Sequence, residues 1–347
     1  MKTLIVKKDH QLRIAEIDRP VYDDCQALVK IVSCGICNGT DAKLIHGTFK
    51  GFAEDRYPLM LGHEAVGRVI ETGRLVEGLK TGDLVLLPFV EASGPYQSAW
   101  GGFSEYGVVS DLPAVLRHAP HDLERVGLAR SQTVLPDWVD PVEAVMIVTL
   151  REVLSSIRRF KMRENDSVVV FGCGPVGQTF IRFLHLLGVK PIIALDIVEE
   201  KLELARSLGA DIAMNSQDPD ITDRIRAICP DGVDHVLDAV GISSIINRAM
   251  PLLKDQGAIC CYGISPNLDM QLDWSEAPYN WKLHFQQFPA KEEEGQAHSQ
   301  VMAWLEAGAI RLSDYISDVF PFEEILTAFE RLEKKEIPLK GIIRFDD

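Results

Sequence analysis

A glycine-rich turn between two apolar segments is the feature of this sequence that most clearly predicts chemistry. Val168–Phe171 is a short β-branched apolar run, and glycines follow it at positions 172, 174 and 177 in G-x-G-x-x-G spacing. An amphipathic segment and a second apolar run come next, and that run ends in Asp196. The order strand, tight turn, helix, strand, acid is typical of a dinucleotide site, because each part has a role in holding the ligand.

The cofactor predicted from this segment is NAD. The first glycine permits the tight turn, the second lets the backbone approach the pyrophosphate, and the third lets the helix pack closely on the sheet. Pro175 and Val176 open the helix, whose free N–H groups point at the phosphates. Asp196 can accept hydrogen bonds from the ribose hydroxyls, and no Arg or Lys follows at 197–198 to receive a 2′-phosphate. A glycine-rich turn in another α/β domain is the alternative.

A second group of residues in the N-terminal part could hold a metal ion. A metal ion that binds a substrate oxygen acts as a Lewis acid and stabilises the negative charge that develops on that oxygen. Catalytic zinc keeps three protein ligands and one open position. Cys37 can supply a thiolate and His63 an imidazole nitrogen, while Glu64 could be a third ligand or a group that orients the ligands. His63 could also be a core histidine, and we expect Cys34 to be packed in the core.

Two regions of different pattern must position these residues. Residues 1–115 contain short alternating strands separated by glycine turns, which predicts an irregular, barrel-like β domain. Residues 165–265 alternate apolar strands with amphipathic helices, which predicts a doubly wound α/β domain with a parallel sheet. Helical patterns at 297–309 and 322–334 and a final strand at 341–345 follow.

The composition excludes several classes of partner. The chain has 347 residues and a formal net charge of −15, which suggests two domains and argues against nucleic acid and anionic membranes. No apolar run approaches the roughly 20 residues that span a bilayer, and the apolar stretch at the N-terminus is too short for a signal peptide. The seven cysteines are scattered, so we expect no disulfide framework and a reducing, cytoplasmic location.

Several motifs together resemble the zinc-dependent medium-chain dehydrogenase/reductase family of the alcohol dehydrogenase superfamily. They are C-G-I-C-N-G-T-D at 34–41, L-G-H-E-A-V-G at 61–67, G-G-F-S-E-Y at 101–106 and the glycine motif at 172–177. The branch that looks nearest contains the sorbitol-type polyol and threonine dehydrogenases. The resemblance spans essentially the whole chain. It implies a GroES-like β-barrel catalytic domain made of residues 1–147 and 290–347, and a Rossmann NAD-binding domain at 148–289.

The resemblance also assigns roles to single residues. Cys37 and His63 would be zinc ligands, and in the polyol branch the adjacent Glu64 would be one as well, with water completing the shell. Thr40 would begin the proton relay, although its residue type suits a helix N-cap equally well. Gly263 would line the nicotinamide pocket. A homo-oligomer, either a dimer or a tetramer, is usual for this family.

The sequence departs from the family pattern at three places. One extra residue separates Cys37 from Thr40. The segment 88–104 has no cysteine, whereas many relatives carry four there, so we predict one catalytic zinc and no structural zinc. Val148 stands where relatives often have Glu or Cys, and valine cannot coordinate a metal. Glu152, one helical turn further on, could replace that ligand or be an ordinary exposed glutamate.

Two side chains near the zinc motif leave their roles open. Lys43 stands where many relatives have His, so its ammonium could meet the cofactor ribose, a polar substrate or only solvent. His46 is a weak candidate for a cofactor or substrate contact. Aromatic residues that could line a substrate pocket, or simply pack in the core, are Phe49, Phe52, Trp100, Trp274 and those of the segment Tyr279–Trp281.

The predicted function is a zinc-assisted, NAD-dependent transfer of hydride to or from a small molecule. The substrate would be a secondary alcohol or ketone of a small polyol, sugar, cyclitol or amino alcohol. A zinc-free reductase of activated carbonyl compounds, similar to the quinone reductases, is the first alternative. A binding protein that keeps the cofactor domain without catalysis is the second, and the intact Gly-His-Glu segment argues against it.

Overall fold

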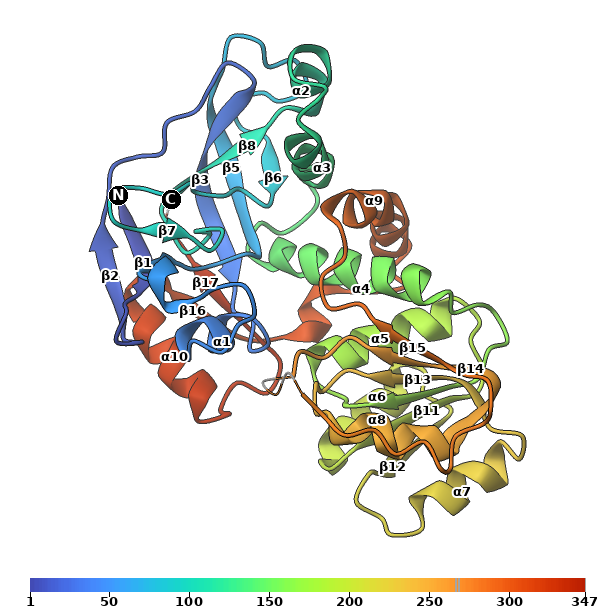
Figure 1. Cartoon of the computed structure of the whole chain (residues 1–347). Helices are drawn as coiled ribbons and strands as arrows, with labels where there is room; N and C mark the ends of the chain where they lie inside the picture. Colours follow the sequence, from blue (N-terminus) through green and yellow to red (C-terminus); the bar gives the residue numbers. More distant parts are fainter. Residues whose placement is uncertain (266, 268, 347) are drawn as a thin grey trace. The chain divides into compact units, whose positions relative to one another are not determined.

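A computed structural model describes residues 1–265, 267 and 269–346, and the chain contacts divide it into two compact units (Figure 1). The first unit is Met1–Arg151 with Ala290–Asp347, and the second is Glu152–Pro289. The predicted domain boundary at residue 148 and this division both fall within helix α4 (Met146–Phe160).

The first unit contains two β-sheets. Its strands are β1 (Lys2–Val6), β2 (Leu12–Glu16), β3 (Gln26–Gly35), β4 (Leu59–Met60), β5 (Ala65–Thr72), β6 (Leu84–Leu86), β7 (Gln97–Ser98), β8 (Tyr106–Ser110), β9 (Val134–Leu135), β16 (Ile316–Pro321) and β17 (Lys340–Arg344). One sheet has the order β16-β17-β3-β5-β6-β9 with β8 paired to β3, and the other has the order β2-β1-β4-β7. Short, mostly antiparallel strands with many turns agree with the barrel-like domain that the sequence predicts.

Strand β3 is the element on which the first unit's chemistry depends. It pairs antiparallel with β5 and with β17, and Cys34 lies opposite Ala65 on one side and Ile343 on the other. Because antiparallel strands run in opposite directions, the end of β3 lies beside the start of β5. Cys34 is fully buried in the apolar core next to β3, as predicted.

Six α-helices of the described residues complete the first unit. They are α1 (Asp41–Ile45), α2 (Leu112–His118), α3 (Leu123–Ser131), the first part of α4, α9 (Lys291–Glu306) and α10 (Ile325–Glu333). Helix α9 begins earlier than the predicted 297. Its first turn contains the acidic run Glu292–Glu294, which would be expected at the surface, but Glu294 is buried and pairs with Lys291 at 2.8 Å. The Arg151 guanidinium, also buried, donates to the Glu294 carbonyl at 3.1 Å.

The second unit is a six-stranded parallel sheet in the order β12-β11-β10-β13-β14-β15. Its strands are β10 (Val168–Phe171), β11 (Ile192–Asp196), β12 (Ile212–Asn215), β13 (Val233–Asp238), β14 (Leu253–Cys261) and β15 (Lys282–Phe285), and its helices are α5 (Pro175–Leu186), α6 (Glu199–Leu208), α7 (Ile221–Ile228) and α8 (Ser244–Ala249). The reversal of strand order between β10 and β13 makes this a doubly wound sheet, as predicted. Ligands bind such sheets at the carboxyl ends of the strands beside that reversal.

No helix among the described residues combines the length and the apolar character needed to span a membrane.

Candidate functional site

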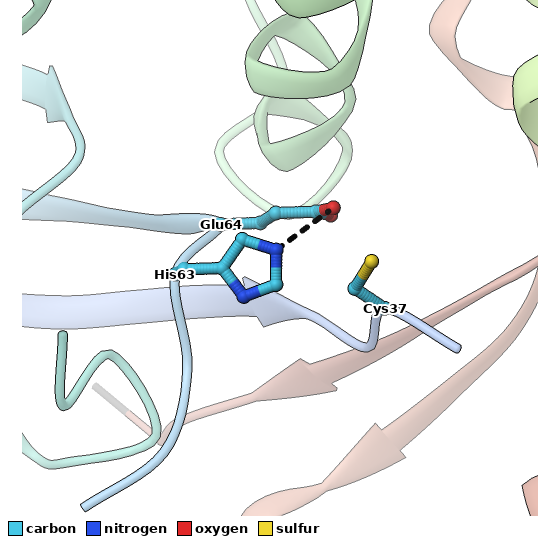
Figure 2. Close-up of side chains that lie close together, drawn as sticks. All are labelled: Cys37, His63 and Glu64. Atoms are coloured by element: carbon cyan, nitrogen blue, oxygen red, sulfur yellow. Dashed lines mark ion pairs between the residues drawn. The ribbon is translucent and has the colours of Figure 1, made fainter. Parts of the chain in front are cut away.

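Three side chains of the first unit converge on one point (Figure 2). One ligand atom from each of Cys37, His63 and Glu64 lies within 4.8 Å of the other two, and no other such group occurs in the described part of the chain. Cys37 follows the end of β3 by two residues, and Glu64 directly precedes β5. The antiparallel pairing of β3 with β5 therefore brings these predicted ligands together.

Asp41 faces the imidazole ring from the side away from Glu64. Its Oδ1 lies 3.5 Å from His63 Nδ1, and both atoms are buried without a hydrogen-bond partner among the described residues. His63 Nε2 lies 3.8 Å from Glu64 Oε1. Burial lowers the pKa of His63, but Asp41 and Cys37 outweigh burial and raise it well above its ordinary value. The cluster therefore carries negative charge that favours a cation at this point.

A buried ion pair fixes the carboxylate of Glu64. Lys340 Nζ donates to Glu64 Oε1 at 2.9 Å and to Oε2 at 2.7 Å. Both side chains are at least 95% buried. Burial raises the pKa of Glu64, but Lys340 and His63 outweigh it and lower the pKa below its ordinary value. Sequence reasoning missed Lys340, whose only signal is a lysine directly before the apolar residues of the final strand.

The extra residue after Cys37 is accommodated by a closed turn. The Asp41 N–H donates to the Cys37 carbonyl at 2.9 Å, and the Cys37 N–H donates to Asp41 Oδ2 at 2.9 Å. Thr40 is buried at the N-cap position of α1, but its side chain makes no capping hydrogen bond. Lys43 Nζ donates to the Gly39 carbonyl at 3.3 Å, and burial lowers the pKa of Lys43.

The other candidate ligands have different surroundings. Val148 is buried in α4 and offers no ligand atom. Glu152 belongs to the second unit, where its carboxylate accepts a hydrogen bond from the Tyr262 hydroxyl at 2.6 Å. His46 lies at the end of α1 and pairs with Glu333 at 3.4 Å, and both residues line a cavity of about 340 Å³.

Aromatic rings lie next to the ligand cluster. The ring centroids of Trp100 and His63 are 5.3 Å apart, those of Phe52 and Trp100 are 6.1 Å apart, and those of Phe49 and Phe52 are 5.7 Å apart. Trp274, the fourth aromatic candidate, lies in the second unit and is 64% exposed.

The glycine turn of the second unit has the shape that a dinucleotide site needs. Gly172 has φ +93°, which favours glycine. A Cβ on Gly177 would overlap the carbonyl oxygen of Gly172, whereas a Cβ on Gly174 would meet nothing within 4 Å. Helix α5 begins with Pro175 and Val176, directly after Gly174. The open space at Gly174 therefore lies at the helix N-terminus, where free N–H groups can bind a phosphate.

Asp196 contacts this turn, and Gly263 contacts the backbone that follows β13. Asp196 Oδ2 accepts a hydrogen bond from the Cys173 N–H at 2.7 Å, and Oδ1 accepts from the N–H of Ile197 at 2.8 Å. Gly263, after β14, packs so closely on Gly241 that a Cβ would overlap its backbone. The predicted cofactor residues thus lie at or just after the carboxyl ends of β10, β11 and β14.

Comparisons with known proteins agree with this arrangement. Residues 23–117 match the alcohol dehydrogenase GroES-like domain family, and residues 175–288 match the zinc-binding dehydrogenase family. An alcohol dehydrogenase of Geobacillus stearothermophilus is 28% identical over 100% of both chains. A D-arabitol-phosphate dehydrogenase of Enterococcus avium is 26% identical over 94% of this chain and 92% of its own. A solved alcohol dehydrogenase of Escherichia coli CFT073, complexed with NADH, superposes with a TM-score of 0.77 at 25% identity and 99% coverage of both chains.

Proposed function

Because this chain is an alcohol dehydrogenase of the zinc-dependent medium-chain dehydrogenase/reductase family, we propose that it transfers a hydride between NAD and a small secondary alcohol or its ketone. The substrate class is a polyol, sugar, cyclitol or amino alcohol. The observation that carries the proposal is the convergence of Cys37, His63 and Glu64, with Asp41 behind the histidine ring.

The donor set fits a single catalytic zinc. A thiolate and an imidazole nitrogen are typical zinc ligands, and a carboxylate oxygen can be a third. Each oxygen of Glu64 has two lone pairs, so it can accept from Lys340 and still face the metal. Two orphaned buried atoms, Asp41 Oδ1 and His63 Nδ1, face each other as a carboxylate and a ligand histidine commonly do. When bound, zinc would polarise the substrate oxygen as a Lewis acid.

Residues of the chain itself would orient the metal ligands and transfer the proton of the substrate. Asp41 orients the His63 ring, and Lys340 keeps Glu64 ionised within the buried site. The Thr40 hydroxyl, which is not engaged as a helix cap, would accept the proton of the substrate alcohol while it passes its own proton on towards solvent. The aromatic ring of Trp100 excludes water from the side of His63.

The second unit would hold NAD through the glycine turn and Asp196. The open space at Gly174 allows a pyrophosphate to approach the start of α5, and the Asp196 carboxylate would exchange its backbone partners for ribose hydroxyls. Gly263 would line the nicotinamide pocket. Seven free cysteines are in keeping with a reducing cytoplasm. The proposed oligomeric state is a homodimer or a homotetramer.

The zinc-free reductase is not favoured, because the chain keeps all three candidate ligands in one cluster and its relatives are zinc-type dehydrogenases. A measurement of zinc content distinguishes the zinc-dependent dehydrogenase from the zinc-free reductase. It uses plasma mass spectrometry on protein purified without a metal-affinity resin. We expect about one zinc per chain in the wild type. Cys37→Ser should lose the metal together with alcohol-dependent NADH formation.

Glu152→Gln is the matched control for the metal experiment. Because Glu152 is engaged by Tyr262, this variant should keep its zinc. If the wild type contained no zinc and still bound NADH, the result would favour the zinc-free reductase over the zinc-dependent dehydrogenase. Two firmly bound zincs per chain would contradict the single-zinc assignment.

A further inference from the structure

Lys43 is a cation beside the ligand cluster that has no acidic partner in the described residues. It lies on α1, half-buried, and its Nζ contacts the Gly39 carbonyl at 3.3 Å. Gly39 belongs to the turn that carries Cys37, and a Cβ on it would lie 3.8 Å from Cys37 Sγ. An ammonium that is partly desolvated, with one carbonyl as its hydrogen-bond acceptor, still has donors available for a ligand.

The charges of the metal-loaded cluster leave Lys43 uncompensated. The Cys37 thiolate and the carboxylates of Asp41 and Glu64 balance the Lys340 ammonium and a divalent ion, while a ligand histidine is neutral. Lys43 then adds a positive charge at the site of a chain whose net charge is −15. A low-dielectric site strengthens the attraction between such a cation and a negatively charged group.

Two further cations lie on the segment that connects α1 to β4. Within the described residues, neither Lys50 nor Arg56 has an acidic partner, and the Arg56 guanidinium lies 5.8 Å from the centroid of the Phe52 ring. The rings of Phe52, Trp100 and His63 connect this cation to the ligand cluster in successive contacts. Glu54 and Asp55 lie on the same segment, so its formal charges balance and the excess positive charge beside the cluster is that of Lys43.

We propose that Lys43 binds a phosphate group of the substrate, so that the alcohol oxidised at this site is a sugar-alcohol phosphate or a similar phosphate ester. This inference rests on the proposed function and narrows its substrate class. Lysine binds phosphate as a point charge through up to three N–H donors. The phosphate would neutralise the excess charge while the reacting hydroxyl group faces the Cys37–His63–Glu64 cluster.

The test compares matched substrates that differ only by the phosphate. Values of kcat/KM are measured for D-arabitol against D-arabitol phosphate and for sorbitol against sorbitol 6-phosphate. The enzymes are the wild type, Lys43→Gln, Lys43→Arg and Lys80→Gln, the last being the same charge change at an exposed lysine of the first unit. Lys43→Gln should lower kcat/KM for the phosphates by about 10–100-fold, mainly through KM, because a charge-assisted hydrogen bond is lost.

The neutral alcohols should change by less than about threefold in Lys43→Gln, and Lys43→Arg should recover most of the loss. Equal losses for phosphorylated and neutral substrates would overturn the inference, as would a wild type that prefers the neutral alcohols. If kcat/KM for the phosphates is unchanged in Lys80→Gln, the effect of Lys43→Gln does not come from the change in net charge.

A binding measurement separates this inference from the proposed function. Inorganic phosphate is titrated calorimetrically into the zinc-loaded protein, and NADH affinity is measured by fluorescence. We expect Lys43→Gln to weaken phosphate about tenfold and to leave NADH affinity unchanged. Weaker NADH with unchanged phosphate would assign Lys43 to the cofactor phosphates and overturn the inference. If no alcohol reduces NAD, the proposed function fails, while the phosphate titration still decides whether Lys43 binds an anion.

Discussion

The glycine turn of the second unit and the ligand cluster of the first unit are held by different interactions. The turn depends on close backbone contacts, such as Gly177 against the Gly172 carbonyl. The cluster depends on buried charges that compensate one another, above all Glu64 and Lys340. A substitution in the turn therefore acts through steric overlap, whereas one in the cluster acts through an uncompensated charge.

The same contrast applies to the buried carboxylates of the two units. Glu64 has a cation within hydrogen-bond distance, and its pKa is lowered. Asp238, at the end of β13, is also buried, but the described residues give it only backbone N–H partners at Val240 and Gly241. Burial raises the pKa of Asp238 to about 6. A buried acid thus stays ionised in one unit and holds a proton at mildly acidic pH in the other.

Removing the cation from the ligand cluster should have the largest effect on stability. Lys340→Met leaves Glu64 buried without its partner, so we expect the free energy of unfolding of metal-free protein to fall by about 3–5 kcal/mol at pH 7.5. Urea denaturation measures this change. The double variant Lys340→Met/Glu64→Gln removes the buried charge and should recover a large part of the loss.

The control for this variant is Lys80→Met, which removes an exposed lysine and should change stability by less than about 0.5 kcal/mol. If Lys340→Met and Lys80→Met were equally stable, Glu64 would not depend on Lys340. The contrast between a charge-held cluster and a sterically held turn would then be wrong.

Two glycines of the turn separate a steric effect on folding from one on the ligand. Gly177→Ala places a methyl group against the Gly172 carbonyl and should cost about 1–3 kcal/mol of stability together with NADH binding. Gly174→Ala meets open space at φ −70°, so stability should be unchanged. NADH affinity should still fall, because the methyl group occupies the space that a pyrophosphate would use. Thermal unfolding and NADH fluorescence measure the two quantities, and a Gly174→Ala variant with wild-type affinity would argue against phosphate binding there.

The two sites also differ in how much of them the sequence predicts. Strand β10 occupies the predicted residues 168–171, because an apolar run directly before glycines and an amphipathic helix is a local signal. The pairing of Cys37 with His63 was inferred from motifs typical of a family. Lys340 was missed because it meets Glu64 across 276 residues, and the pairing of β17 with β3 brings the two residues close together.

Local chemistry also explains the smaller discrepancies. The loop after Cys37 closes around its extra residue through two bonds with Asp41, which the family spacing alone does not predict. Glu294 reads as a surface residue within an acidic run, but the return of α9 against Arg151 buries it. In both cases the missing information is a tertiary partner rather than a residue type.

Asp238→Asn tests the contrast between the buried carboxylates and should have the smallest effect. In the native protein Asp238 keeps its proton above the unfolded-state pKa, so this group lowers the unfolding free energy as pH rises through about 4–6. Asn cannot titrate but can still accept from Val240 and Gly241. Relative to the wild type, Asp238→Asn should therefore gain about 1–2 kcal/mol between pH 5 and pH 8. Urea denaturation at the two pH values measures the difference, and a variant that follows the wild-type pH dependence would show that Asp238 is ionised in the folded protein throughout this range.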